Sequence, residues 1–212
     1  MLSTSLLFLF VSNAIADFVD PRDHLLNRQH QALQDCLHAK AVPTTLNSSS
    51  AWASLTTAFN LRLQYTPVAV TIPETPQQVS DSITCAAAAG IKVQPRSGGH
   101  SYGSYSLGGK NGSLTIDLQK FNEVSLDKGR QLNHFFIIFA NMYQGTGIVR
   151  AGGGVRLGNL GLGVYKQGQA ALPHGTYPGV GIGGHYTHGG FGYSSRRWGK
   201  YRCFANICND SS

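Results

Sequence analysis

The chain has 212 residues, which is enough for one domain or for two small lobes that share a core. Its formal net charge is +7, but it contains no run of Lys and Arg and no stripe of basic and aromatic residues, which argues against a nucleic-acid-binding protein. The 26 glycines are clustered, which indicates loops with unusual backbone angles or a close approach of the backbone to a ligand.

The N-terminus is typical of a secreted protein. Residues 6–11 form an apolar run that is too short to span a bilayer, and Ala14 and Ala16 supply the small residues that a signal peptidase reads. We therefore expect a signal peptide over residues 1–16, a secreted chain and no membrane association. The alternative for the apolar run is a buried N-terminal strand. Asn47 and Asn111 each begin a glycosylation sequon, which fits secretion.

Two of the four cysteines lie on predicted helices. Cys36 belongs to a helical face over residues 23–40, within an N-terminal helical segment expected at 17–62. Cys85 lies on the next predicted helix, so the two thiols can pair in an oxidising compartment. The other two cysteines lie in residues 200–212, which show no assignable pattern and are interpreted as an aberrant tail.

A strand–helix–strand unit follows. Residues 67–72 are rich in β-branched side chains and predict a strand. Thr75 and Gln78 form a capping box at the start of a helix that Gly90 ends. Residues 91–94 predict a second strand, which completes a βαβ unit. Further along, a strand is expected at 114–118 and a helix at 157–167.

Residues 129–144 interrupt an otherwise regular pattern. They contain a solid apolar run at 135–140, inside what is otherwise a polar hairpin. Without them, residues 124–128 would join 145–154 as two alternating strands with a tight glycine-containing turn. We therefore interpret 129–144 as a retained intron. The alternative is a genuine buried strand or a lipid-facing loop.

The first glycine-rich segment, residues 96–103, follows the βαβ unit. Its three glycines let backbone N–H groups converge on an anion such as a phosphate, and Arg96 could add positive charge. The alternative is a tight turn that carries a solvated His100.

The second glycine-rich segment spans residues 172–199. Val180 and Ile182 alternate with glycines there, so the segment could lie flat against a planar ring and donate main-chain hydrogen bonds to its edge. His185 and His188 suggest a metal ion, but no Cys or carboxylate accompanies them, so no metal site is predicted.

Three segments together resemble one family, the PCMH-type FAD-binding domain of the vanillyl-alcohol oxidase superfamily, and within it the berberine-bridge-enzyme-like and glucooligosaccharide oxidases. The segments are QPRSGGHSYGSYSLGG (94–109), GGGVRLGNL (152–160) and ALPHGTYPGVGIGGHYTHGGFGYSSRRWG (171–199). The resemblance covers residues 30–128 and 145–199. It implies an α+β fold in which two α/β lobes, here over 63–199, form an incomplete FAD-binding domain whose substrate domain is missing.

The resemblance also implies roles for particular residues. Residues 96–102 would wrap the FAD pyrophosphate, and His100 would bond covalently to the 8α-methyl carbon of the flavin. Residues 178–184 would line the isoalloxazine and the pyrophosphate. The implied cofactor-binding residues are Arg96, Ser97, Gly98, Gly99, His100, Ser101, Tyr102, Gly175, Tyr177, Pro178, Gly179, Val180, Gly181, Gly183, Gly184 and His185.

Two departures from the family pattern limit these expectations. Tyr177 stands where doubly tethered members carry a Cys that bonds to flavin carbon 6, so we expect a single tether through His100. Family members continue for about as much chain again, so no catalytic acid or base is assigned.

The expected function is an FAD-dependent oxidase that passes a hydride from a carbohydrate or other alcohol to FAD and then electrons to O₂. This chain is expected to be inactive alone. The alternatives are a non-catalytic FAD-binding fragment and a berberine-bridge-type oxidase of a secondary metabolite.

Overall fold

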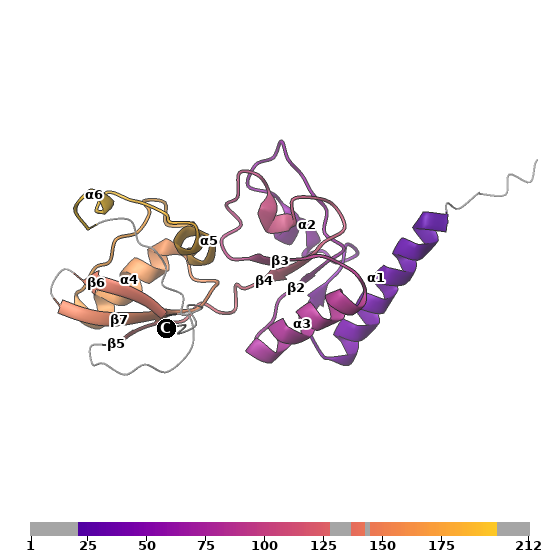
Figure 1. The fold of residues 1–212 in the computed structure, drawn as a ribbon, viewed down its shortest axis with the longest axis horizontal. Helices are drawn as coiled ribbons and strands as arrows, with labels where there is room; N and C mark the ends of the chain where they lie inside the picture. The colour runs from indigo at the N-terminus through magenta and orange to yellow at the C-terminus, as the bar shows by residue number, and fades with distance from the viewer. Residues whose placement is uncertain (1–20, 128–136, 143–144, 199–212) are drawn as a thin grey trace, which may run out of the picture.

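The computed structural model describes residues 21–127, 137–142 and 145–198, which form two α/β lobes (Figure 1). This arrangement confirms the predicted fold class. The first lobe contains α1 (Pro21–Ala39), β1 (Thr44–Thr45), α2 (Trp52–Thr56), β2 (Ala69–Thr71), α3 (Pro76–Ala88), β3 (Val93–Arg96), the short 3-10 helix η1 (Tyr105–Leu107) and β4 (Leu114–Asp117). The second contains β5 (Val124–Asp127), β6 (Ile137–Met142), β7 (Gly145–Ala151), α4 (Leu157–Gly168), α5 (Ile182–Thr187) and α6 (Ser195–Trp198).

The first lobe is built on a four-stranded sheet of order β1-β2-β4-β3. β2 and β3 both run parallel to β4, so the predicted βαβ unit has β4 inserted between its two strands. Helices α1 and α3 cover one face of the sheet, where Leu33, Leu37, Ala86 and Leu114 are buried. The Cys36–Cys85 disulfide joins these two helices, which confirms that the two thiols pair.

The start of α3 follows the predicted capping chemistry with a shift of one residue. Thr75 Oγ1 accepts a hydrogen bond from the Gln78 N–H at 3.2 Å. Gln78 Oε1 accepts from the N–H of Glu74 at 2.8 Å, rather than from that of Thr75. After the helix, Gly90 has a φ of +69°, which a residue with a Cβ rarely adopts, and the chain turns into β3.

The second lobe has a three-stranded antiparallel sheet of order β5-β7-β6, against which α4 packs. β5 pairs directly with β7, with Val124 opposite Ala151 and Asp127 opposite Ile148, which is the hairpin pairing expected from the sequence. β6 pairs with the other edge of β7. It is the described part of residues 129–144, and the retained-intron interpretation of that segment stays a prediction.

Two further expectations, the signal peptide at 1–16 and the tail at 200–212, lie outside the described residues. None of the helices among the described residues combines the length and the apolar character that crossing a membrane requires.

Candidate functional site

Two glycine-rich loops meet at the junction of the lobes. We call residues 96–103 the first glycine loop and residues 175–184 the second glycine loop. A Cβ added to Gly98 would lie 2.1 Å from the backbone nitrogen of Gly181, and a Cβ added to Gly181 would lie 2.1 Å from that of Gly98. The loops can therefore approach this closely only because both positions are glycine.

The first glycine loop presents unused hydrogen-bond donors. In the described part of the chain, no backbone N–H from 98 to 103 donates a hydrogen bond. The loop is held instead by Ser97, whose Oγ donates to the Gly153 carbonyl and accepts from the Gly183 N–H at 3.2 Å. Free backbone N–H groups in a glycine-rich loop are donors suited to a phosphate, so the chemistry of this loop agrees with the phosphate-binding role expected from the sequence.

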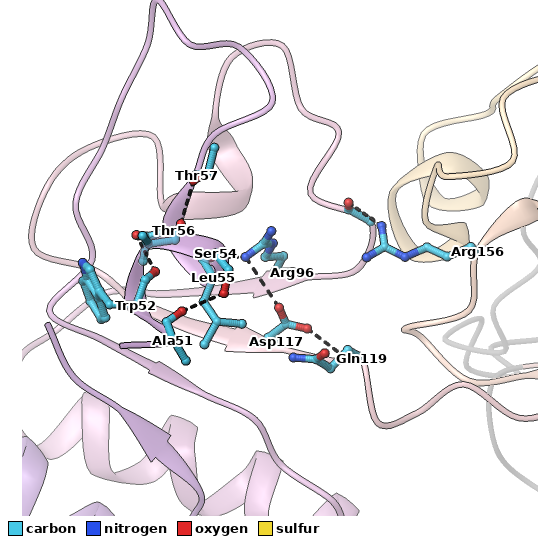
Figure 2. A network of polar contacts seen from close by, with 12 residues as sticks. Ala51, Trp52, Ser54, Leu55, Thr56, Thr57, Arg96, Asp117, Gln119 and Arg156 are labelled. Carbon is cyan, nitrogen blue, oxygen red and sulfur yellow. Dashed lines mark hydrogen bonds and ion pairs between the residues drawn. The ribbon is translucent and has the colours of Figure 1, made fainter. Parts of the chain in front are cut away.

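The side chain of Arg96 makes its polar contacts within the first lobe. Its Nη1 donates to the Leu55 carbonyl of α2 and lies 3.6 Å from Asp117 Oδ2 (Figure 2). Burial raises the pKa of Asp117, while the Gln119 N–H, Arg96 and Arg156 act in the opposite direction. The positive guanidinium thus compensates the buried carboxylate of Asp117. The two contacts fix Arg96, which is the first residue of the first glycine loop.

His100 stands between aromatic rings from two other segments. Its ring centroid lies 4.4 Å from that of Phe59, after α2, and 5.2 Å from that of Tyr177 in the second glycine loop. A Cβ on Gly179 would lie 3.2 Å from His100 Nε2, so the ring lies close over that backbone. Burial and, to a lesser extent, Arg156 lower the pKa of His100, which favours the neutral imidazole that can act as a nucleophile.

Other predicted residues of the two loops make mainly structural contacts. Ser101 Oγ accepts from the N–H of Tyr105, and Tyr102 is largely exposed. The carbonyls of Pro178 and Val180 accept hydrogen bonds from the N–H groups of Gly158 and Leu157, at the start of α4. These bonds satisfy the first free donors of the helix and fix the second glycine loop against it.

The expectation that the second glycine-rich segment lies flat against a planar ring is wrong over residues 182–187, and over residues 172–181 it stays a prediction. From Ile182 the backbone is the helix α5, which the sequence reading missed. Ile182 and Tyr186 lie one helical turn apart and are both buried in the core of the second lobe, and this burial outweighs the poor helix propensity of the glycines between them.

His185 lies on α5 and contacts the start of the second glycine loop. Its Nε2 accepts a hydrogen bond from the Gly175 N–H at 3.0 Å. Burial, followed by His174, lowers the pKa of His185, in agreement with a neutral ring that accepts at Nε2. A Cβ added to Gly184, by contrast, would meet no neighbouring atom within 4 Å. No cluster of three or more potential metal-ligating side chains occurs among the described residues.

Sequence reasoning missed three residues of this site. Arg156 bonds to both glycine loops, Phe59 stacks on His100, and Asp117 holds Arg96. Arg156 lies within a segment that carries the family resemblance, GGGVRLGNL, and an arginine two residues after three consecutive glycines was a usable signal. Phe59 and Asp117 had none, because each acts through a contact with a residue distant in sequence.

Comparison with known proteins places this geometry in a family. Residues 67–206, more than half of the chain, match the family described as FAD binding domain. A xylooligosaccharide oxidase of Thermothelomyces thermophilus is 40% identical over 79% of this chain and 31% of its own length. The wild-type BBE-like 1 protein of Physcomitrella patens superposes with a TM-score of 0.69 at 36% identity, covering 80% of this chain and 33% of that one.

A third similar protein carries a described flavin linkage. The glucooligosaccharide oxidase of Acremonium strictum, characterised for its 6-S-cysteinyl, 8α-N1-histidyl FAD, superposes with a TM-score of 0.69 at 35% identity, covering 80% of this chain and 32% of that one. The chain thus spans about a third of the length of the relatives it matches, so the expectation that family members continue for about as much chain again was too low. The match over more than half of the sequence shows that this chain belongs to the FAD binding domain family, as its motifs predicted.

Proposed function

We propose that this chain is the FAD-binding part of a secreted oxidoreductase and that it bonds FAD covalently through His100. The observation that carries the proposal is the meeting of the two glycine loops at Gly98 and Gly181, with the His100 ring of the first loop next to Gly179 and Tyr177 of the second. The unbonded N–H groups of the first glycine loop would receive the pyrophosphate. The Cys36–Cys85 disulfide supports an oxidising compartment.

The covalent step balances with molecular oxygen as the oxidant. Attachment removes one hydrogen from an imidazole nitrogen of His100 and one from the 8α-methyl carbon of FAD, and joins the two atoms. O₂ takes up the two electrons and two protons as hydrogen peroxide. The neutral imidazole favoured by the lowered pKa of His100 supplies the lone pair for this bond.

For the whole protein, we propose oxidation of an alcohol or hemiacetal of a carbohydrate, in which FAD accepts a hydride and O₂ then reoxidises it. The names of the xylooligosaccharide and glucooligosaccharide oxidases support this substrate class. The similarity to the BBE-like protein supports a second candidate, an oxidase of a secondary metabolite. A substrate panel on a longer chain that includes the substrate domain, scored by flavin bleaching and reoxidation in air, separates the two candidates. We expect no turnover from the 212-residue chain alone.

The cofactor proposal is tested by intact mass. The chain is expressed with its own leader, and the secreted product, after removal of N-glycans, reduction and denaturation, is expected to weigh as residues 17–212 plus one FAD minus two hydrogens. His100→Ala should give the bare-chain mass. His188→Ala, which removes an exposed histidine, should keep the adduct. A bare-chain mass for the unaltered protein, or an adduct in His100→Ala, contradicts the proposal.

A further inference from the structure

A single guanidinium nitrogen connects the two lobes at the site. Arg156 Nη1 donates to the carbonyl of Gly98 in the first glycine loop and, at 3.0 Å, to the carbonyl of Gly179 in the second. Figure 2 shows its side chain reaching from the second lobe towards the first. The Arg156 backbone is fixed as well, by a β-bridge to Gly181 and by its place at the N-cap of α4.

The surroundings of Arg156 make these bonds strong. Burial lowers the pKa of Arg156, while Asp117 raises it, and an arginine remains protonated at neutral pH. A charged donor in a partly buried site forms stronger hydrogen bonds than a neutral one. Gly98 lies two residues before His100, and Gly179 lies two residues after Tyr177. The nitrogen that joins their carbonyls therefore also links the backbone segments that carry the rings of His100 and Tyr177.

We propose that Arg156 is a positioning residue for flavin attachment: by holding the carbonyls of Gly98 and Gly179 on one nitrogen, it keeps the His100 ring of the first lobe against the second glycine loop of the second lobe. The inference rests on the proposed role of His100. It adds a residue that does not touch the reacting atoms but fixes where the nucleophile stands.

The test compares Arg156→Gln and Arg156→Lys with Lys166→Gln, which removes one positive charge from an exposed position on α4. The rate of covalent FAD attachment, followed by intact mass on the full chain, should fall at least about tenfold in Arg156→Gln because two charge-assisted hydrogen bonds are lost. Arg156→Lys should recover part of the rate, and Lys166→Gln should attach FAD as the unaltered chain does.

A ligand-free readout separates positioning from general destabilisation. In the chain labelled at histidine and aromatic side chains, nuclear Overhauser contacts join the His100 ring to Phe59 in the same lobe and to Tyr177 in the other lobe. Arg156→Gln should weaken the contact with Tyr177 and keep the one with Phe59. It should also raise the pKa of His100, because a nearby cation is removed. Among the described residues, the other titratable or charged residues near His100 are Tyr102, Tyr177, Arg96 and Asp117. They are unchanged in every variant, so a change in the pKa of His100 is due to position 156.

The outcomes decide the inference separately from the proposed function. If the unaltered chain attaches no FAD, the proposed role of His100 fails, and the ligand-free spectra still decide whether Arg156 sets the ring position. If it attaches FAD and both Arg156 variants do so at the same rate, or keep the contact of His100 with Tyr177, the inference is wrong. If Arg156→Gln does not fold, Arg156→Lys decides: an unchanged rate and an unchanged contact overturn the proposal.

Discussion

The rings of His100 and Tyr177 lie 5.2 Å apart, inclined at 54°, although one belongs to the first lobe and the other to the second. Tyr177 is 60% exposed, so its ring borders open space beside His100 rather than filling a core. The glucooligosaccharide oxidase to which this chain is similar is described with both a cysteinyl and a histidyl bond to FAD. We therefore expect the residue at position 177 to determine whether this chain forms one bond to FAD or two.

Tyr177→Cys is expected to create a second point of attachment. In a His100→Ala background, Tyr177→Cys should restore covalent FAD, because a thiolate is a far better nucleophile than a phenol. The expected mass is again chain plus FAD minus two hydrogens, with O₂ taking up the electrons. Tyr177→Ser in the same background is the control and should give the bare chain. A bare-chain mass for the Cys variant would show that position 177 does not face the cofactor.

Gly181→Ala should separate the two glycine loops. The new Cβ meets the backbone of Gly98, which cannot rotate away, so we expect a loss of about 3 kcal/mol or more in unfolding free energy. Gly184→Ala adds the same methyl group within α5 where nothing lies within 4 Å, and should be neutral or stabilising by up to about 1 kcal/mol. Urea denaturation measures both, and equal effects would contradict the close contact.

Loss of the Cys36–Cys85 disulfide should destabilise the first lobe. The bridge closes a loop with a sequence separation of 49, for which the chain-entropy treatment gives roughly 4 kcal/mol. The double variant Cys36→Ser, Cys85→Ser should therefore unfold at a lower urea concentration than the oxidised chain. Adding a reductant should shift the unaltered chain towards the double variant and leave the variant itself unchanged. A variant as stable as the oxidised chain would contradict the expected contribution.

The unfolding free energy should decrease as the pH falls, and part of this decrease should come from His185. Its pKa in the folded chain lies below the ordinary value of 6.5, so between those two values the unfolded chain binds more protons. The unfolding free energy then decreases as the pH falls below 6.5. His185→Gln keeps an acceptor for the Gly175 N–H but does not titrate, so its decrease should be smaller. His188→Gln, at an exposed position, should retain the original pH dependence, and identical profiles for all three chains would contradict the assignment.

Deleting residues 129–144 should leave a folded second lobe. β5 pairs with β7 in a register that places Asp127 opposite Ile148. In the deletion variant the same register pairs Lys128 with Gly147 and leaves Gly145-Thr146 as a two-residue turn. Glycine at the first position of such a turn suits type II′. The shorter connection should keep or raise the unfolding free energy, by roughly 1 kcal/mol from loop closure alone. A Gly/Ser linker of equal length is the control that removes only the apolar strand. Unfolding of the deletion variant would identify β6 as integral.

The sequence by itself determined the local features of this protein. The helix at Pro76–Ala88, the strand at Leu114–Asp117 and the pairing of β5 with β7 followed from capping, β-branched residues and alternation, which act between near neighbours in the chain. The glycine-rich motifs determined the family, and the disulfide followed from two cysteines on two helices.

Only the tertiary structure decided how the site is assembled. Arg156 and Gly98 are 58 residues apart in sequence, and the contacts of Phe59 and Tyr177 with His100 also join distant segments. The helix α5 likewise forms because Ile182 and Tyr186 are buried in a core that other elements supply. Local pattern cannot encode these contacts, because their free energy comes from burial and hydrogen bonding between segments that only the folded lobes bring together.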